Sequence, residues 1–116
     1  MLSVPLAAGD LAPHLGPDLD IASVNAPELT VASGPQAALD ALEARLAAIG
    51  VDCQRIPIDI AAHSRMLEPI LGRFGDYLRG IRLSAPAIPF VSNRTGRFIT
   101  DEEATSPDYW VAHLRG

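Results

Sequence analysis

The sequence predicts an α+β fold, and three observations support this prediction. First, four short apolar segments bounded by turn-forming residues are typical of strands: residues 2–6, 19–25, 29–33 and 51–60. Second, one helical segment follows the first strand and another follows the third. Third, residues 61–116 do not continue this alternation. The order strand, helix, strand, strand, helix, strand is the split β-α-β or ferredoxin-like pattern, and it is complete near residue 60.

The first three strands and the first helix follow from local signals. Residues 2–6 alternate apolar and polar side chains, and Pro5 indicates an edge position or a strand end. A short helix is predicted over residues 7–15, although it contains a glycine and a proline. Residues 25–28 are turn formers between two strands, so the second and third strands are expected to make a hairpin.

The clearest helix of the sequence extends from about Pro35 to Ile49. Its apolar side chains recur three and four residues apart on one face: Leu39, Leu42, Leu46 and Ile49. Pro35 suits the first helical turn, and Gly50 suits the position after the last one. The fourth strand, residues 51–60, then completes the pattern.

The second half contains too few elements for an independent core. Ser64 can cap a helix that extends to about Arg79, and Pro69 makes its start irregular. The apolar face of this helix consists of Leu67, Ile70, Leu71, Phe74 and Leu78. A buried strand, a turn, a short strand, an acidic loop and a terminal helix are expected next, over residues 88–92, 93–96, 97–100, 101–106 and 107–114. In the terminal helix, Tyr109 and Trp110 are predicted to be packing anchors.

Composition and charge exclude several classes of function. Apolar residues make up 48% of the chain and charged residues 20%, which is ordinary for a globular domain and unlike a disordered chain. The net charge of -5, with Arg as the only basic residue besides His, leaves no basic stripe for nucleic acid. No apolar run approaches the ~20 residues that span a bilayer. No secretory signal is visible, so a cytoplasmic location is expected.

The cysteine and histidine residues indicate neither a disulfide nor a metal site. Cys53 is the single cysteine of the chain, so it has no partner for a disulfide. His14, His63 and His113 lie far apart without the spacing of metal ligands. We expect His14 and His113 to be surface residues.

His63 is the strongest candidate for a catalytic residue. It follows an apolar strand and the small residues Ala61 and Ala62, and it precedes the expected helix start at Ser64. A histidine side chain ordinarily titrates near neutral pH, and flanking backbone can fix its tautomer, so this place suits a general base. No Gly-x-Ser-x-Gly motif, which would supply a serine nucleophile, occurs in the 116 residues. The sequence therefore predicts one half of a catalytic pair.

Five blocks of sequence resemble a known enzyme family. In order, they are Ser23–Pro27; Val31–Gly34; Ile58–Ser64 with Glu68 and Pro69; Ile88–Asn93 with Thr95 and Gly96; and Tyr109 and Trp110 with Leu114 and Arg115. Through these blocks nearly the whole chain resembles the C-terminal portion of malonyl-CoA:acyl-carrier-protein transacylases, in particular the acyltransferase domain of modular type I polyketide synthases. The resemblance implies that residues 1–60 are the ferredoxin-like small subdomain. Residues 61–116 would be the C-terminal segment of an α/β-hydrolase-like large subdomain that carries the catalytic histidine.

The same resemblance implies roles for particular residues. His63 matches the family's general base, which deprotonates a serine. That serine takes an extender acyl group, malonyl or methylmalonyl, from CoA and passes it to the phosphopantetheine thiol of an acyl carrier protein. Backbone carbonyls of the segment that matches Ser92 and Asn93 orient the imidazole. The implied partners are an acyl carrier protein and the remaining synthase domains, and no bound cofactor is implied.

Other parts of the family's site are expected upstream of this chain. They are the Gly-x-Ser-x-Gly elbow, a glutamine-containing oxyanion segment and an arginine that pairs the carboxylate of the extender unit. Four arginines of this chain lie in the wrong places to replace that upstream arginine, and we expect them to be solvated surface charges: Arg55, Arg65, Arg94 and Arg97. We therefore predict that the isolated chain is inactive.

Substrate selectivity is expected at the residues that precede the histidine. In the family, His-Ala-Phe-His is associated with malonyl and Tyr-Ala-Ser-His with methylmalonyl extender units. The corresponding residues here are Ile60, Ala61, Ala62 and His63, which match neither pattern. Ala62 leaves more room than a phenylalanine would, and this favours a methyl-branched substrate.

Two other interpretations remain open. One is a freestanding ferredoxin-like binding or interaction module with residues 61–116 as an appended arm, and the other is a complete small hydrolase that pairs another serine with His63. The fragment interpretation predicts that the helix at 64–79 exposes a sizeable apolar face or self-associates through it. A binding module would be monomeric and well packed.

Two short segments are expected to be irregular. Asn25–Pro27 is expected to be a turn, and the alternative is that it belongs to a face toward acyl-CoA or carrier protein. Asp101–Glu103 is expected to be a solvated loop.

Overall fold

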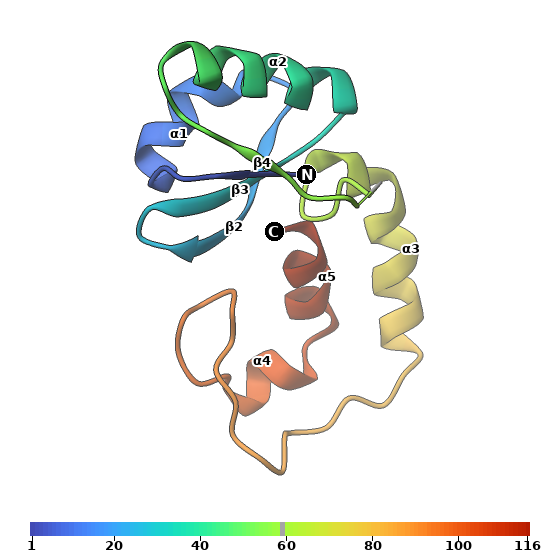
Figure 1. Cartoon of the computed structure of the whole chain (residues 1–116). Helices are drawn as coiled ribbons and strands as arrows, with labels where there is room; N and C mark the ends of the chain where they lie inside the picture. The colour runs from blue at the N-terminus through green and yellow to red at the C-terminus, as the bar shows by residue number, and fades with distance from the viewer. Residues whose placement is uncertain (59) are drawn as a thin grey trace. The chain divides into compact units, whose positions relative to one another are not determined.

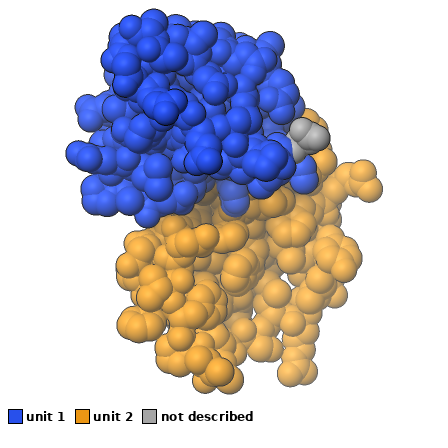
Figure 2. Space-filling view, in the orientation of Figure 1, with its two compact units in different colours: residues 1–67 blue, residues 68–116 orange. Residues whose placement is uncertain are grey.

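The computed structural model describes residues 1–58 and 60–116 (Figure 1). Asp59, which belongs to the predicted strand 51–60, lies outside the described residues. The chain divides into two compact units, Met1–Leu67 and Glu68–Gly116 (Figure 2). The boundary expected from the sequence is residue 60, whereas the first unit extends to Leu67 and also contains the corner around His63.

The first unit has the predicted element order. Its elements are β1 (Leu2–Val4), α1 (Ala8–Leu15), β2 (Asp20–Ala26), β3 (Leu29–Ser33), α2 (Gln36–Ala48), β4 (Gln54–Arg55) and the 3₁₀ helix η1 (Arg65–Leu67). The strands form one antiparallel sheet in the order β2-β3-β1-β4. β2 and β3 pair as the predicted hairpin, with irregularities in register between Ile21 and Ser23 and between Val24 and Ala26.

The fourth strand is shorter than predicted. β1 is three residues long and pairs with β4 through Leu2 opposite Arg55 and Ser3 opposite Gln54. Beyond that point the Ile56 N–H donates to the carbonyl of Met1 at 3.0 Å, and Pro57 has no N–H to continue the ladder. Among the described residues that follow, 56–58 and 60–63, none lies in a strand.

The core of the first unit lies between the sheet and its two helices (Figure 1). It consists of Leu2, Val4, Leu11, Leu19, Ala32, Leu39, Leu42 and Leu46, all at most 2% exposed. The helical spacing of the three leucines of α2 therefore predicted the buried face correctly. Ile49 was wrongly assigned to that face, since it is 61% exposed. The helix ends at Ala48, so a helical projection no longer applies to the next residue.

The second unit contains the helices α3 (Glu68–Arg79), α4 (Asp101–Thr105) and α5 (Pro107–Arg115). α3 and α5 pack against each other (Figure 1). Leu78 is the buried apolar side chain of α3. The irregular start predicted near Pro69 is confirmed, because η1 precedes α3 instead of a regular helical turn. The terminal helix is confirmed as well.

Three predictions for residues 88–106 are wrong. In place of strands at 88–92 and 97–100 there is a single bridge between Val91 and Phe98, and Ile88 is 80% exposed. Pro89 removes a backbone donor in this segment, which limits ladder pairing. Instead of an acidic loop, Asp101–Thr105 form α4.

A capping box explains α4. The hydroxyl of Thr100 accepts the Glu103 N–H, and the carboxylate of Glu103 accepts the Thr100 N–H at 3.0 Å. The negative charges of the first helical turn also suit the helix dipole. This Thr-x-x-Glu signature is present in the sequence and would have predicted the helix.

Candidate active site

His63 lies in a strained corner of the first unit. Its φ of 53° is the one positive value among the described non-glycine residues. A residue with a Cβ rarely adopts this left-handed backbone conformation. The conformation persists only where the neighbouring structure enforces it. Such residues cluster at functional sites, and the half-buried imidazole of His63 is consistent with one.

Ser64 closes this corner from inside. It is 1% exposed, and its hydroxyl donates to the carbonyl of Ala61 at 2.7 Å. The same oxygen accepts the N–H of Met66 at 3.3 Å, while the Ser64 carbonyl accepts the N–H of Leu67 at 3.0 Å. Ser64 thus caps the short η1 helix, as its predicted capping role requires. Its hydroxyl also links the residues before and after His63 through hydrogen bonds.

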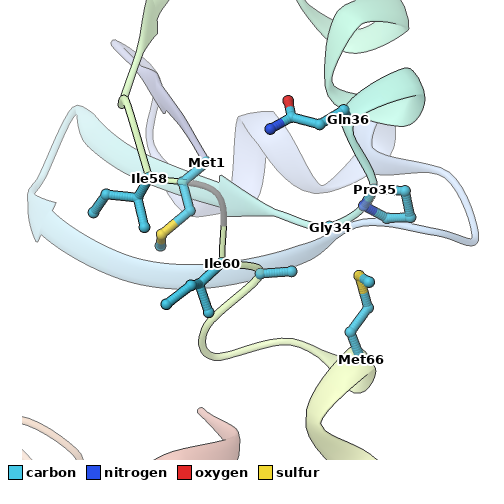
Figure 3. A pocket seen from close by; sticks show the side chains of 8 residues that line it. Met1, Gly34, Pro35, Gln36, Ile58, Ile60 and Met66 are labelled. Atoms are coloured by element: carbon cyan, nitrogen blue, oxygen red, sulfur yellow. The ribbon is translucent and has the colours of Figure 1, made fainter.

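Ile60 and Ala61, two of the three predicted selectivity residues, line a pocket of largely apolar residues (Figure 3). Its volume is about 120 Å³, and it is lined by Met1, Gly34, Pro35, Gln36, Ile58, Ile60, Ala61 and Met66. The lining comes from the chain start, the loop before α2 with the first residue of that helix, and the residues around the corner. Ile60 is 62% exposed, whereas Ala61 and Ala62 are half-buried. Two of the three selectivity residues therefore line one hollow.

Ser92 is the buried centre of a turn in the second unit. It is 2% exposed, and its hydroxyl oxygen accepts the N–H groups of Arg94 and Thr95, each at 3.2 Å. Its N–H donates to the carbonyl of Arg97, and its own carbonyl accepts the Gly96 N–H, both at 2.8 Å. The turn predicted at residues 93–96 is therefore confirmed, with Gly96 at a φ of 70°.

Asn93 and the aromatic side chains of α5 lie near this turn. The side-chain oxygen of Asn93 lies 2.8 Å from Nε2 of His113, so this partly exposed histidine has a polar partner. Tyr109 is 8% exposed and meets Trp110 edge to face, with ring centroids 5.1 Å apart. The Trp110 indole N–H donates to the Ala104 carbonyl at 2.9 Å. The anchoring role predicted for both rings is confirmed.

Arginine side chains form ion pairs that the sequence did not indicate. Arg55 pairs with Asp40 and Glu43 of α2, and Arg97 pairs with Glu103 at 2.9 Å. Arg65 pairs with Asp20, whose hydrogen bonds and charge raise the pKa of the guanidinium. Arg65 was expected to be a solvated surface charge and Asp20 was not singled out. Their separation of 45 residues leaves no local pattern by which the sequence could have revealed the pair.

The remaining titratable groups offer no further centre in the part of the chain that the structure describes. Burial raises the pKa of the half-buried Cys53 thiol, and the nearby carboxylates of Glu43 and Asp52 add to this effect. Within residues 1–58 and 60–116 there is no cluster of three or more His, Cys, Asp or Glu side chains placed to hold a metal ion. None of the described helices has the length and apolar character needed to cross a membrane.

Comparison with protein families relates the whole chain to one domain type. The family model for the acyl transferase domain matches residues 1–116. A type I polyketide synthase of phenolphthiocerol synthesis from Mycobacterium bovis is 36% identical over 115 residues. Polyketide synthase GfsB of Streptomyces halstedii is 39% identical over 118 residues. Each match covers 99% of this chain, which spans only 5% and 2% of the respective relatives.

The chain is also similar to solved structures of acyltransferases. The acyltransferase domain of SpnD, in complex with 2-(pent-4-yn-1-yl)malonyl, is 41% identical with a TM-score of 0.92, and the match covers 98% of this chain and 28% of that one. Malonyl CoA-acyl carrier protein transacylase from Burkholderia pseudomallei is 25% identical with a TM-score of 0.83, covering 99% of this chain and 40% of that one. The family resemblance stated from the five sequence blocks is therefore confirmed.

Proposed function

The chain belongs to the acyl transferase domain family, and from that premise we propose that it supplies the general base of a polyketide synthase acyltransferase. The reaction would move an extender acyl group from CoA to the phosphopantetheine thiol of an acyl carrier protein. The observation that carries this proposal is the corner of His63, where an uncommon backbone conformation is braced by the buried Ser64.

The proposed mechanism begins with proton transfer to the imidazole of His63. The serine hydroxyl loses its proton to His63 as its oxygen attacks the thioester carbonyl of the acyl-CoA. Collapse of the tetrahedral intermediate releases CoA, whose sulfur takes the proton from the imidazolium. The carrier-protein thiol then gives a proton to His63 and attacks the acyl-serine, and the imidazolium returns that proton to the serine oxygen. The base is therefore regenerated at the end of each cycle.

The nucleophile of this reaction must come from outside these residues. No Gly-x-Ser-x-Gly motif is present in the 116 residues, so we expect no transacylation by this chain alone. The carrier protein and the other synthase domains are the partners that the proposal requires. We expect CoA and phosphopantetheine to act as substrate groups, with no bound cofactor, in the cytoplasm.

We assign the two parts of the chain in the terms of the family's subdomains. Residues 1–60 would be the ferredoxin-like small subdomain, which the all-antiparallel strand order β2-β3-β1-β4 supports. Residues 61–116 would belong to the α/β-hydrolase-like large subdomain. Exposed apolar side chains on α3, such as Ile70 at 48%, support the expectation that this segment needs a covering surface or self-associates.

Backbone carbonyls of Ser92 and Asn93 are proposed to orient the imidazole of His63. Support comes from the rigidity of the turn, since the Ser92 hydroxyl, N–H and carbonyl are all engaged within the second unit. A carbonyl oxygen has two lone pairs, so the bond from the Gly96 N–H leaves the Ser92 carbonyl able to accept a second hydrogen bond.

A methyl-branched extender unit is the proposed substrate. Ala62 stands where the malonyl pattern of the family has phenylalanine, and Ile60 and Ala61 line a pocket of about 120 Å³. Small residues near the reacting acyl group leave room for an added methyl, although one methyl group discriminates by only about 10- to 200-fold. We therefore expect a preference for methylmalonyl over malonyl within that range.

The proposal is tested by reassembly of an acyltransferase domain. The chain is coexpressed with an upstream acyltransferase segment that carries the serine elbow, and acyl transfer to a carrier protein is measured with malonyl- and methylmalonyl-CoA. We expect transfer by the reassembled domain and a loss of about 100-fold or more in His63→Ala. His14→Ala is the matched control, and it should keep full activity. Activity of His63→Ala equal to that of this control would contradict the proposal.

A further inference from the structure

Arg65 directs three of its N–H donors at the carboxylate of Asp20. Its backbone N–H donates to Oδ2 of Asp20 at 2.7 Å, and its Nε donates to the same oxygen at 3.1 Å. Its Nη2 donates to Oδ1 of Asp20 at 2.7 Å, and its Nη1 donates to the carbonyl of Pro17. The guanidinium therefore binds the carboxylate with two parallel bonds, the arrangement that gives an arginine pair its geometric specificity.

The pair is better placed than an ordinary surface ion pair. The side chain of Asp20 is only 16% exposed, although that of Arg65 is 50% exposed. Exposed single-contact pairs contribute little, whereas bidentate pairs with a shielded member can hold a fixed geometry. Asp20 also begins β2 and stands opposite Ser33 of β3, so its backbone belongs to the sheet. The carboxylate thus provides a rigid anchor for Arg65.

His63 lies inside the segment that this anchor holds. On one side, the Ser64 hydroxyl bonds the carbonyl of Ala61. On the other side, the Arg65 N–H bonds the carboxylate of Asp20. His63 sits between these two fixed points with a φ of 53°, a conformation that the chain would not keep without support.

We propose that Asp20 and Arg65 are positioning residues that hold the His63 corner in its reactive conformation. The proposal rests on the role of His63 as general base. Loss of the pair lets the corner relax toward ordinary backbone angles, and the imidazole then moves away from the serine. A small misplacement of a catalytic group can lower a rate by up to about 100-fold. Substrate binding is not expected to change, because neither side chain is assigned to it.

The test uses the reassembled acyltransferase with Asp20→Ala and Arg65→Lys. We expect kcat for acyl-serine formation to fall by about 10- to 100-fold, with KM for the acyl-CoA unchanged. Arg65→Lys keeps the charge and the backbone N–H but loses the two-bond fork, so it separates geometry from charge. Arg97→Gln is the matched control, since it breaks a pair of similar exposure, 61% and 20%, in the second unit.

NMR signals of His63 distinguish a role of Asp20 and Arg65 in positioning this residue from a role in overall stability alone. In the 116-residue chain, the NMR Cα shift and the amide exchange of His63 should move toward averaged values in Asp20→Ala and in Arg65→Lys, but not in Arg97→Gln. Unchanged His63 signals together with wild-type kcat in Arg65→Lys would overturn the proposal even if Asp20→Ala failed to fold. A general fall in stability with the same kcat would overturn it as well.

The outcome for His63 itself distinguishes the two proposals. If His63→Ala abolishes transfer while the Asp20 and Arg65 variants behave like Arg97→Gln, the positioning role is refuted and the general base stands. If His63→Ala retains full activity, the general base is refuted and the positioning role with it. A loss in His63→Ala with an intermediate loss in the Asp20 and Arg65 variants supports both.

Discussion

The hydroxyl groups of Ser92 and Tyr109 lie 2.5 Å apart in the interior of the second unit, across 17 residues of sequence. Because the Ser92 oxygen already accepts the N–H groups of Arg94 and Thr95, both of its lone pairs are used, and its hydroxyl must donate to Tyr109. One side chain therefore joins a turn to α5. The backbone carbonyl of the same residue is proposed to orient His63.

Replacing Ser92 by alanine is expected to destabilise the second unit by about 1–3 kcal/mol, because two N–H groups and a buried tyrosine oxygen lose their partner. Tyr109→Phe should cost less, since it leaves only the Ser92 hydroxyl proton unpaired. The free energy of unfolding can be followed in urea by the fluorescence of Trp110, the single tryptophan of the chain. The exposed Ser84→Ala serves as the control, and an equal cost for Ser84 and Ser92 would contradict this account.

Gly34 has no room for a side chain, so a substitution there is predicted to destabilise the first unit. A Cβ at this position would lie 2.6 Å from the carbonyl oxygen of Asp18 and 2.7 Å from Cδ2 of Leu19. Gly34→Ala should therefore destabilise the first unit by about 1–3 kcal/mol. Gly9 is the matched control, because a Cβ there meets nothing within 4 Å and the residue lies in α1.

Gly34→Ala and Gly9→Ala should change the free energy of unfolding in opposite directions. Gly9→Ala improves helix propensity and is expected to stabilise by up to about 1 kcal/mol. Urea unfolding followed by far-ultraviolet circular dichroism measures both changes. A stabilising effect of Gly34→Ala would mean that the loop before α2 can move aside at no cost.

Cys53 is predicted to react slowly with alkylating reagents in the folded chain. Burial, with help from Glu43 and Asp52, raises its pKa above the ordinary 9.0, so the native thiol keeps its proton to higher pH than the unfolded one. The native state then binds more protons in that range. Stability is unaffected below the unfolded pKa and falls as the pH rises above it.

Rates of iodoacetamide modification against pH, in native and in urea-unfolded chain, measure the two pKa values of Cys53. Asp52→Asn should lower the native value and leave the unfolded value in place, because it removes one nearby negative charge. A native pKa at or below the unfolded one would refute the burial of the thiol.

Most of the first unit could be predicted because its signals are local. The spacing of Leu39, Leu42 and Leu46 places three side chains on one face of a helix, and all three are buried. Turn residues between two apolar segments identified the hairpin of β2 and β3. The fourth strand was overestimated because its length depends on β1, a partner about fifty residues away in the chain.

The second unit was harder to predict for a physical reason. Apolar residues at Ile88 and Val91 resemble a buried strand, yet a strand needs a partner whose position the sequence does not reveal, and both side chains are exposed. The helix at Asp101–Thr105 was missed for a different reason. Its capping box is local, but the acidic composition of the segment suggested a loop.

The sequence by itself determined the element order of the first unit, the family and the position of His63 after two small residues. Only the tertiary structure decided the φ of 53° at His63, the burial of Ser64 and the pairing of Asp20 with Arg65. Periodic patterns record which side of an element faces the core, because neighbouring residues share that element. A hydrogen bond between residues 45 positions apart depends on how the chain returns upon itself, and no local pattern encodes that return.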